Sequence, residues 1–595
     1  MPIYKAPVDE LTFLLAEVFP LARHANLPGF ADATPDLVSA VLAEAAKLAE
    51  EVVQPLNRRG DQEGCIRRGD GAVATPSGFA EAYRRYADGG WIGLAAPTEY
   101  GGQSLPGVLA AAVNEFMNSA NMAFAMYPGL TQGAIAALLL HGTPAQNALY
   151  LPPMIAGRWS GTMNLTEPQC GTDLALVRTK AVKHQDGTYR ISGSKIFISA
   201  GEHDLTENIV HLVLARIEGA PEGTRGLSLF LVPKVRPDPD GSLGARNAVS
   251  CGAIEAKMGI HGNATCVMNY EGASGALVGE ENRGINAMFT MMNEARLGVA
   301  VQGLALSEVA YQNAAAYAKE RLQGRALPGA KFPQRPADPI IVHPDVRRML
   351  LTIRAFNEAG RAAVVWTALQ GDLAHRAADA ATREAAEDHM ALLTPVLKGV
   401  LTDRGFANTV LAQQVFGGHG YIAEHGMEQF VRDARIAMLY EGANGVQALD
   451  LVGRKLARDN GRAVQALLAE IGSFIAERRE GAIEPYVGPL TTALGHLREA
   501  TLWLMQNAPR QPDHAGAAAT DYMHLMGLVV LGYMWCRIIA AVLPQSATEQ
   551  DRARRRAKLV TARFFVERLL PATALHLARI RCGADSTMEL TDEEF

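Results

Sequence analysis

The period of the apolar pattern changes along this chain, and that change limits the folds that the chain can adopt. Up to about residue 156, apolar residues recur at helical spacing, as in the alanine-rich stretches 35–53 and 108–120. Between about residues 161 and 279, runs of β-branched and alternating residues, bounded by glycine, proline or charge, predict strands. The predicted strands cover residues 188–200, 209–217, 227–235 and 265–270.

Helical spacing returns at about residue 286 and continues to about residue 581. A proline-rich segment, 328–344, interrupts it and predicts a long loop between helices. The order α, β, α, α predicts an α+β multidomain protein. Its predicted parts are an N-terminal leader (1–34), an N-terminal helical domain (35–160), a middle antiparallel β domain (161–280), a helical bundle (281–460) and an additional C-terminal helical extension (461–595).

With 595 residues, 48% of them hydrophobic and 20% charged, the chain is expected to form several cores of a soluble globular protein. A net charge of -6 gives no overall attraction to nucleic acid or to an anionic membrane. The segment 525–543 is apolar enough to resemble a membrane span. It contains Arg537, Gly527 and Gly532, however, so a buried bundle helix is expected there.

The six cysteines are scattered without a close pair, which argues against a disulfide framework, a zinc ribbon or a redox pair. The histidines also lack the spacing of metal ligands, so no metal site is predicted. The N-terminal segment reaches Asp9 and Glu10 before any apolar run and lacks the order of a signal peptide. A cytoplasmic location is therefore expected.

A lone carboxylate, Glu441, precedes a glycine-rich turn at the start of a helical pattern. Gly442 and Gly445 allow backbone conformations that a residue with a Cβ resists. In apolar surroundings a carboxylate on such a turn has a raised pKa, which suits a general base. The alternative is an acidic residue that is merely stabilised by the dipole at a helix N-terminus.

The segment 165–173, LTEPQCGTD, resembles the TEP-x-x-GSD signature of acyl-CoA dehydrogenases, with Thr172 in place of the usual serine. Thr166, Gly171 and Thr172 can present hydroxyl and backbone N–H groups to a planar heterocycle and a phosphate. The alternative is an ordinary Pro-Gly turn capped by threonine and aspartate.

The segment 195–199, KIFIS, is similar to the K-x-W-I-T strand that lies along the flavin in the same family. Phe197 stands where tryptophan is usual, and Ser199 stands where threonine is usual. An aromatic ring can still shield a flavin face, and a hydroxyl can still bond near the reactive flavin nitrogen. As isolated residues, both would be ordinary strand core.

Two further segments resemble FAD-binding segments of this family. The segment 414–421, QVFGGHGY, lies a short way upstream of Glu441, as in the family, where its glutamine and glycine pair contact adenosine and pyrophosphate, often across a subunit boundary. The segment 321–325, RLQGR, resembles R-x-Q-F-G, whose guanidinium meets the pyrophosphate, although the phenylalanine is missing here. Ala443 also replaces a threonine that many relatives direct toward FAD.

Arg296, in the segment 293–297, NEARL, matches the family's arginine on the helix that faces the catalytic site. Its alternative role is a surface salt-bridge partner. Some members carry their catalytic glutamate immediately before this arginine, where this chain has Ala295. Glu294 is one residue further away and belongs to a different helical face, so the resemblance assigns the base to Glu441.

The resemblance covers residues 35–455 with its motifs in family order. It implies an acyl-CoA dehydrogenase-like fold, FAD as cofactor, and α,β-dehydrogenation of an acyl-CoA thioester to a trans-2-enoyl-CoA, with Glu441 removing the α-proton. The residues that it assigns to FAD are Met163, Leu165, Thr166, Gly171, Thr172, Phe197, Ser199, Arg321, Gln323, Gln414, Gly417, Gly418, Ala443 and Gly445. The residues that it assigns to the acyl-CoA are Thr172, Asn293, Arg296 and Gly442.

The leader and the extension, with the stretches 201–204 and 291–296, resemble those of the large bacterial subfamily that includes methylthiopropanoyl-CoA dehydrogenases. This resemblance implies a fatty acyl-CoA or methylthiopropanoyl-CoA as substrate. It also implies electron-transferring flavoprotein as electron acceptor, a homodimer, and no membrane association.

Two other functions stay open at this point. An acyl-CoA oxidase that passes electrons to oxygen uses a nearly identical set of residues. A flavin-bearing DNA-binding protein on the same scaffold is favoured by a basic run, although such runs are usually solvated helix faces. The basic residues of that run are Arg552, Arg554, Arg555, Arg556 and Lys558. The extension itself has two further possible roles, dimer formation and covering of the acyl cavity.

Overall fold

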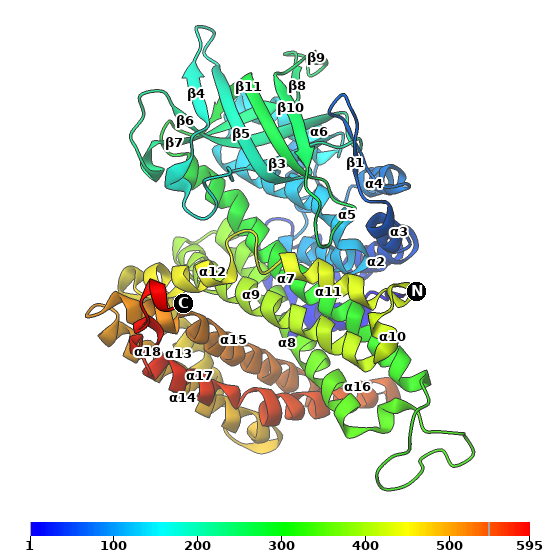
Figure 1. The fold of residues 1–595 in the computed structure, drawn as a ribbon. Helices are drawn as coiled ribbons and strands as arrows, with labels where there is room; N and C mark the ends of the chain where they lie inside the picture. The colour runs from blue at the N-terminus through cyan, green and yellow to red at the C-terminus, as the bar shows by residue number, and fades with distance from the viewer. Residues whose placement is uncertain (1, 545–547) are drawn as a thin grey trace. The chain divides into compact units, whose positions relative to one another are not determined.

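The computed structural model describes residues 2–544 and 548–595, without the side chains of Glu294, Gln550 and Asp551. The chain forms two compact units (Figure 1). One unit is Ala43–Gly298, here called the sheet unit. The other, here called the helical unit, combines Met1–Leu42 with Val299–Phe595.

The sheet unit opens with helices, as the apolar pattern predicts. They are α2 (Pro35–Leu48, whose first residues belong to the helical unit), α3 (Leu56–Glu63), α4 (Phe79–Asp88), α5 (Gly107–His141) and α6 (Pro144–Ile155). Helix α5 carries a kink at Asn121, where the backbone leaves helical geometry (φ -164°, ψ 95°). A short hairpin of β1 (Ile66–Arg67) and β2 (Val73–Ala74) was not indicated by the sequence.

A seven-stranded sheet follows the helices of the sheet unit. Its strands are β3 (Trp159–Asn164), β4 (Lys180–Lys183), β5 (Tyr189–Ser199), β6 (Asn208–Ile217), β7 (Leu227–Pro233), β10 (Val249–Ile254) and β11 (Thr265–Val278). Their order is β10-β11-β5-β4-β6-β3, and β7 pairs with both β6 and β11, so the pairings of β11, β5, β4, β6 and β7 close into a ring. The interior of this ring is filled by alternate apolar side chains such as Ile191, Val213 and Phe230.

Most of the strand pairings are antiparallel, as predicted. Two pairings that the sequence did not indicate are parallel, because β3 and β4 both run in the direction of β6. The predicted strand 227–235 also divides after Pro233. Its continuation, β8 (Val235–Pro237), pairs with β9 (Leu243–Arg246) in a separate two-stranded ribbon.

The helical unit is built on three long helices. They are α7 (Gly284–Glu320, whose first turns belong to the sheet unit), α8 (Pro344–Arg376) and α9 (Ala380–Val415). The predicted proline-rich loop joins α7 to α8 and extends away from both helices (Figure 1). Asp338, which is fully buried, ties this loop together by accepting main-chain hydrogen bonds from Ala326, Lys331 and Phe332 at 2.8–3.0 Å.

Within its described residues, the extension supplies five long helices and a short one, α18 (Asp585–Met588), to the helical unit. The long helices are α13 (Arg462–Glu477), α14 (Glu484–Asn507), α15 (Pro512–Val542), α16 (Glu549–Phe564) and α17 (Ala572–Arg581). Among the described residues, α5 and α15 are the two helices that are long and apolar enough to cross a membrane. In their most apolar windows, 67% of α5 and 83% of α15 are buried inside the protein, which accounts for this composition. Helix α15 is thus the buried helix that was expected at 525–543.

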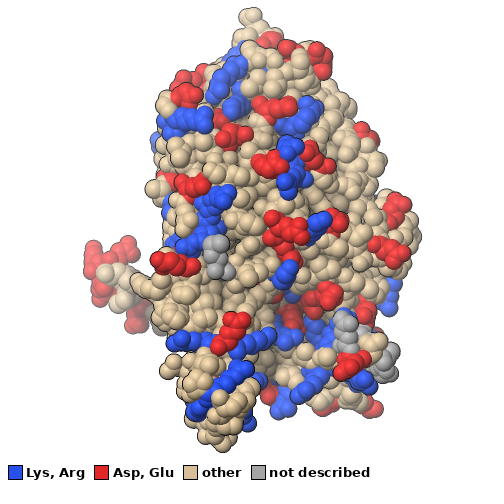
Figure 2. Space-filling view, turned by 90° about the vertical axis from the view of Figure 1, so that its right-hand side faces the viewer, with Lys and Arg blue, Asp and Glu red and all other residues tan. Residues whose placement is uncertain are grey.

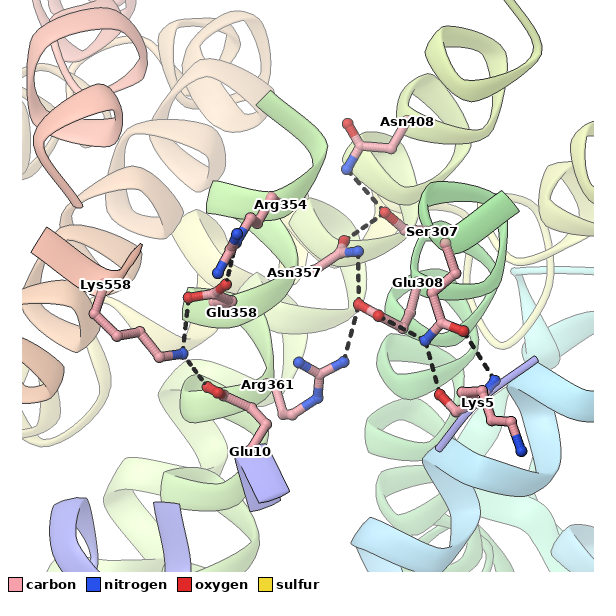
Figure 3. Close-up of polar contacts among 11 residues, drawn as sticks. Lys5, Glu10, Ser307, Glu308, Arg354, Asn357, Glu358, Arg361, Asn408 and Lys558 are labelled. Atoms are coloured by element: carbon pink, nitrogen blue, oxygen red, sulfur yellow. Dashed lines mark hydrogen bonds and ion pairs between the residues drawn. The ribbon is translucent and has the colours of Figure 1, made fainter. Parts of the chain in front are cut away.

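A buried ion-pair network joins the leader to the extension (Figure 3). Lys558 of α16, whose side chain is 3% exposed, donates to Glu10 of α1 (Val8–Phe13) and, at 2.8 Å, to Glu358 of α8. Glu358 also accepts a 2.6 Å hydrogen bond from Arg354. One buried ammonium therefore fastens three segments that are far apart in the sequence.

A second part of the network connects the leader to α7. Glu308 pairs with Arg361 at 3.1 Å and accepts from Asn357 at 2.9 Å. Gln312, which also donates to Glu308, bonds both the N–H and the carbonyl oxygen of Lys5. The leader is thereby held as an integral part of the helical unit.

Candidate active site

Glu441 lies in a strained turn between α11 (Met427–Ile436) and α12 (Asn444–Asp450). Its φ is +56°, a left-handed conformation that side chains with a Cβ rarely adopt, and Gly442 follows with φ +84°. A side chain at position 442 would be strained by this positive φ, and its Cβ would also lie 2.4 Å from Nε2 of Gln447. A strained non-glycine residue of this kind is typical of functional sites. We call residues 439–443 the Glu441 turn.

Buried side chains fix the main chain of the Glu441 turn. The amide of Gln447 donates to the carbonyl oxygens of Glu441 and Gly442 at 3.0 and 3.3 Å. The ammonium of Lys398, fully buried on α9, donates to the Gly442 carbonyl at 2.8 Å. The N–H of Asn444 closes the turn onto the carbonyl of Met438 at 3.1 Å. The peptide groups are thus held in one orientation while the Glu441 side chain stays half-exposed.

Tyr440, beside the base candidate, is held by a hydrogen bond of its own. Its hydroxyl donates to the side-chain oxygen of Gln302 on α7. Burial raises the pKa of Tyr440, and the neighbouring charge of Glu441 raises it further. The Tyr440 hydroxyl thus ties the Glu441 turn to α7.

In the sheet unit, a buried ion pair joins two of the predicted FAD segments. Lys195 of β5 lies 2.8 Å from Glu167, and it also donates to the carbonyl of Leu165 at 2.8 Å. Desolvation alone would raise the pKa of Glu167, but the charge of Lys195 and hydrogen bonds from Thr179 and Arg178 lower it to about 2. The segment after β3 is therefore fastened to β5, next to Phe197.

Several residues of these two segments are exposed. Phe197 has φ +58° inside β5, and 59% of its surface is exposed although it is a large aromatic residue on a strand. A hydrogen bond from the Ile196 N–H to the Thr166 carbonyl places the two segments side by side. Gly171 and Thr172 are exposed, and a Cβ on Gly171 would meet no atom within 4 Å.

The remaining flavin candidates of the sheet unit lie at and just beyond the end of β3 and at the end of β5. Successive side chains of a strand point to opposite faces, so Met163 lies on the face opposite to buried Thr162 and Asn164. Met163 and Ser199 are half-buried, and Leu165 is buried.

On α7, the side chain of Arg296 is buried. Its guanidinium lies 5.7 Å from the ring centre of Phe289 and donates to Asn293 at 3.4 Å. Asn293 is exposed. Ala295 occupies the position where other members carry a base, and the side chain of Glu294 lies outside the described residues.

The helical unit brings the other two FAD segments together. Tyr317, near the end of α7, stacks on Phe416 with ring centres 4.1 Å apart, and its hydroxyl lies 2.8 Å from Nδ1 of His419. Arg321 and Gln323, which follow α7, therefore lie near the turn between α9 and α10 (Gly418–Tyr421).

Open space surrounds the groups that this region offers to a phosphate. The side chains of Arg321, Gln323 and Gln414 are exposed. A Cβ on Gly417 or Gly418 would meet no atom within 4 Å. Exposed guanidinium, amide and glycine N–H groups of this kind suit a pyrophosphate, and the exposed ring of Phe197 suits an isoalloxazine, so the residues present fit FAD.

Two FAD candidates belong to the start of α12. Ala443 is the N-cap of this helix and has no side-chain capping bond, which agrees with the missing hydroxyl. A Cβ on Gly445 would meet no atom within 4 Å, so there is open space beside this residue at the helix start.

The sequence reasoning missed the residues that hold these segments in place. They are Glu167, Lys195, Lys398, Asn444 and Gln447. One signal was present, because Lys398 interrupts an apolar helical stretch and a buried lysine needs partners. The identity of those partners is not encoded in local spacing.

Two other kinds of ligand, metal ions and nucleic acid, have less support in the described residues. Among the described residues, no group of three or more His, Cys, Asp or Glu side chains can hold a metal ion. In the basic run on α16, Lys558 is buried in ion pairs and Arg554 lies over the ring of Phe13. Acidic and basic side chains are intermixed over much of the face shown in Figure 2. The basic run is thus not a fully exposed patch for nucleic acid.

Four family models match successive parts of the chain. They describe the acyl-CoA dehydrogenase N-terminal domain (residues 38–158), its middle domain (162–273), its C-terminal domain (282–456), and an acetyl-CoA dehydrogenase C-terminal-like domain (467–591). Together they account for most of the chain, including the extension.

Individual proteins agree with these matches. A 3-methylmercaptopropionyl-CoA dehydrogenase of Ruegeria pomeroyi is 42% identical over 98% of this chain and 99% of its own length. A broad-specificity linear acyl-CoA dehydrogenase of Mycobacterium tuberculosis is 33% identical over the full length of both. The structure of an acyl-CoA dehydrogenase of Bacillus anthracis in complex with FAD shares the fold, with a TM-score of 0.74 and 20% identity over 93% of this chain and 89% of that one. The chain belongs to the acyl-CoA dehydrogenase family.

Proposed function

We propose that this enzyme binds FAD, removes the α-proton of an acyl-CoA thioester with Glu441, and forms the trans-2-enoyl-CoA. The observation that carries the proposal is the strained Glu441 turn, in which Gln447 and Lys398 hold the main chain and leave the carboxylate half-exposed. Because the main chain is already fixed, the carboxylate loses less conformational freedom when it meets a substrate.

The chain's own residues supply orientation and proton transfer. Glu441 takes the α-proton, and a positioned general base of this kind contributes about 10²–10⁴-fold to the rate. The main-chain N–H at Glu441 is proposed to donate to the thioester oxygen, where negative charge develops as the proton leaves. When bound, FAD supplies the acceptor for the hydride from the β-carbon.

The proposed binding residues fall into three groups. For the flavin ring and its surroundings we propose Met163, Leu165, Thr166, Gly171, Thr172, Phe197 and Ser199. For the rest of FAD we propose Arg321, Gln323, Gln414, Gly417, Gly418, Ala443 and Gly445. For the acyl-CoA we propose Thr172, Asn293, Arg296 and Gly442.

Anaerobic reduction of the bound flavin tests the role of Glu441. We expect Glu441→Gln to keep its FAD but to lose about 10²–10⁴-fold in the rate at which an acyl-CoA bleaches the flavin absorbance. Glu428→Gln, on neighbouring α11, is the control and should bleach at the wild-type rate. Normal bleaching by Glu441→Gln would remove this residue as the base.

For the substrate we propose 3-methylmercaptopropionyl-CoA or a fatty acyl-CoA of similar length, because the relative that is 42% identical over nearly the whole chain is named for the former. The enzyme is titrated anaerobically with straight-chain acyl-CoAs and with 3-methylmercaptopropionyl-CoA. The rate of flavin reduction divided by the Kd should be highest for 3-methylmercaptopropionyl-CoA or for the straight-chain acyl-CoA of the same length. A preference for long chains would contradict this choice.

For the electron acceptor we propose electron-transferring flavoprotein, with oxygen as the alternative. The reduced enzyme should be reoxidised by electron-transferring flavoprotein at least tenfold faster than by air-saturated buffer, and the reverse order would make it an oxidase.

We further propose a cytoplasmic homodimer with the five-part division 1–34, 35–160, 161–280, 281–460 and 461–595. Light scattering of the purified holoenzyme measures the oligomeric state directly.

A further inference from the structure

Helix α15 of the extension lies against α9 directly behind the Glu441 turn. A Cβ on Gly399 would lie 2.3 Å from Sδ of Met523, and one on Gly527 would lie 2.6 Å from a methyl carbon of Val400. The two glycines therefore permit a close crossing of the two helices. Gly399 is next in sequence to Lys398, whose ammonium holds the Gly442 carbonyl.

A continuous series of polar contacts leads from this crossing to the turn. Nε2 of His524, on α15, lies 2.9 Å from Oδ2 of Asp403 on α9. Oδ1 of Asp403 accepts a 2.6 Å hydrogen bond from the side-chain amide of Asn444, the first residue of α12. Oδ1 of Asn444 in turn accepts from Lys398 at 2.7 Å. His524 is thus three hydrogen bonds away from the ammonium that holds the Glu441 turn.

The orientation of His524 is fixed on its other side as well. Its ring stacks on that of His576, with centres 5.8 Å apart and planes 11° from parallel. Nδ1 of His576 lies 2.7 Å from Asp521, one helical turn before His524 on α15. The side chain of His524 is only 13% exposed, so it has little freedom to turn away from Asp403.

We infer that His524 is a positioning residue for the dehydrogenation. By holding Asp403, it keeps Asn444 in place and thereby fixes the start of α12 and the direction of the Glu441 carboxylate. This inference rests on the proposed role of Glu441 as the base. A misplacement of the base by about 1 Å can reduce the rate about 10²-fold. Loss of the contact between His524 and Asp403 therefore has a measurable effect on the rate, although neither residue touches the substrate. The extension then contributes to the reaction indirectly, by positioning the proposed base.

Two amide variants at one position test the inference. In His524→Gln the side-chain nitrogen reaches about as far as Nε2, whereas in His524→Asn it falls short of Asp403. We expect His524→Asn to reduce the limiting rate of anaerobic flavin reduction by butanoyl-CoA and by 3-methylmercaptopropionyl-CoA about 10- to 100-fold, with the apparent Kd changed less than about twofold. His524→Gln should keep about a third of the wild-type rate or more.

Hydrogen exchange of the resting holoenzyme gives a reading that does not depend on the reaction. Main-chain amides of residues 438–448 should exchange faster in His524→Asn than in His524→Gln or wild type. His496→Asn is the matched control, because His496 lies on α14 of the same extension and contacts only the hydroxyl of Thr573, at 3.0 Å, among the contacts described here. It should leave both the rate and the exchange of 438–448 unchanged.

Several results would overturn the inference. Wild-type rate and exchange in His524→Asn would do so, as would equal losses in the Gln and Asn variants or an equal loss in His496→Asn. Loss of bound FAD in both His524 variants would also count against it, because a purely structural contact gives that result. Retained bleaching in Glu441→Gln, by contrast, would remove the proposed base whatever the His524 variants show.

Discussion

The ammonium of Lys195 lies 2.8 Å from the carboxylate of Glu167, and both side chains are buried in the sheet unit. This pair joins the segment after β3 to β5, so it fixes the two stretches that we assign to the flavin ring. A buried charge that loses its partner is strongly destabilising, whereas removal of both charges is often tolerated. The pair is therefore a sensitive point of the fold.

Replacement of Lys195 by methionine leaves the Glu167 carboxylate buried without its cation. We expect Lys195→Met to lower the free energy of unfolding by about 3–5 kcal/mol, measured by urea denaturation of the holoenzyme. The double variant Lys195→Met/Glu167→Leu should recover much of this loss. Lys180→Met, at an exposed position of neighbouring β4, is the control, and an equal loss there would contradict the argument.

The same pair predicts a pH dependence of stability. The folded-state pKa of Glu167 is lowered to about 2 from an ordinary value of 4.5, mainly by Lys195 acting against desolvation. The stability that this carboxylate contributes is therefore fully present above about pH 4.5 and is lost as the pH falls toward 2. The deficit of Glu167→Gln relative to wild type should shrink over that range, and a constant deficit from pH 7 to pH 2.5 would refute the assignment.

Lys558 should have a comparable effect in the helical unit. It connects Glu10 of the leader with Glu358 of α8, so Lys558→Met leaves two carboxylates without their shared cation. We expect a loss of about 3–5 kcal/mol in unfolding free energy and faster proteolysis within the leader. Arg556→Met, at an exposed position of the same helix, should change neither quantity.

Phe197 should matter for the cofactor more than for the fold. Its ring is 59% exposed, so Phe197→Ala removes little buried surface from the protein itself. Stacking of an aromatic side chain on a planar base is worth about 1–3 kcal/mol, so we expect FAD to bind roughly tenfold more weakly. Equilibrium dialysis of the apoenzyme with FAD measures this change, and an unaltered Kd with unaltered flavin fluorescence would place the flavin elsewhere.

The sequence predicted the large elements well, because their patterns are periodic. The predicted strands 188–200 and 209–217 correspond to β5 and β6 within two residues at each end. Strand β3 was missed because Ser160, Thr162 and Asn164 are polar residues that point into the interior. Their hydrogen bonds to His203, His211 and Tyr270 replace the apolar contacts that a pattern search requires.

The candidate site was predictable only where it is local in sequence. Glu441, Gly442 and the predicted FAD segments could be proposed because each is a short continuous motif. Lys398 and His524 were not found, because their contacts join residues 44 and 121 positions apart. Contacts at such separations follow from helix packing, and local spacing carries no signal for them.

Because Glu441 has a left-handed backbone conformation, a substitution at this position that increases stability is expected to decrease activity. A non-glycine residue in this region is strained by about 1–3 kcal/mol, which the rest of the fold must offset. Glycine at position 441 would remove the strain together with the carboxylate, giving a protein that is more resistant to unfolding but unable to act on its substrate. Selection for thermal stability alone would therefore tend to discard the proposed base, and any stabilised variant of this enzyme has to be screened for turnover.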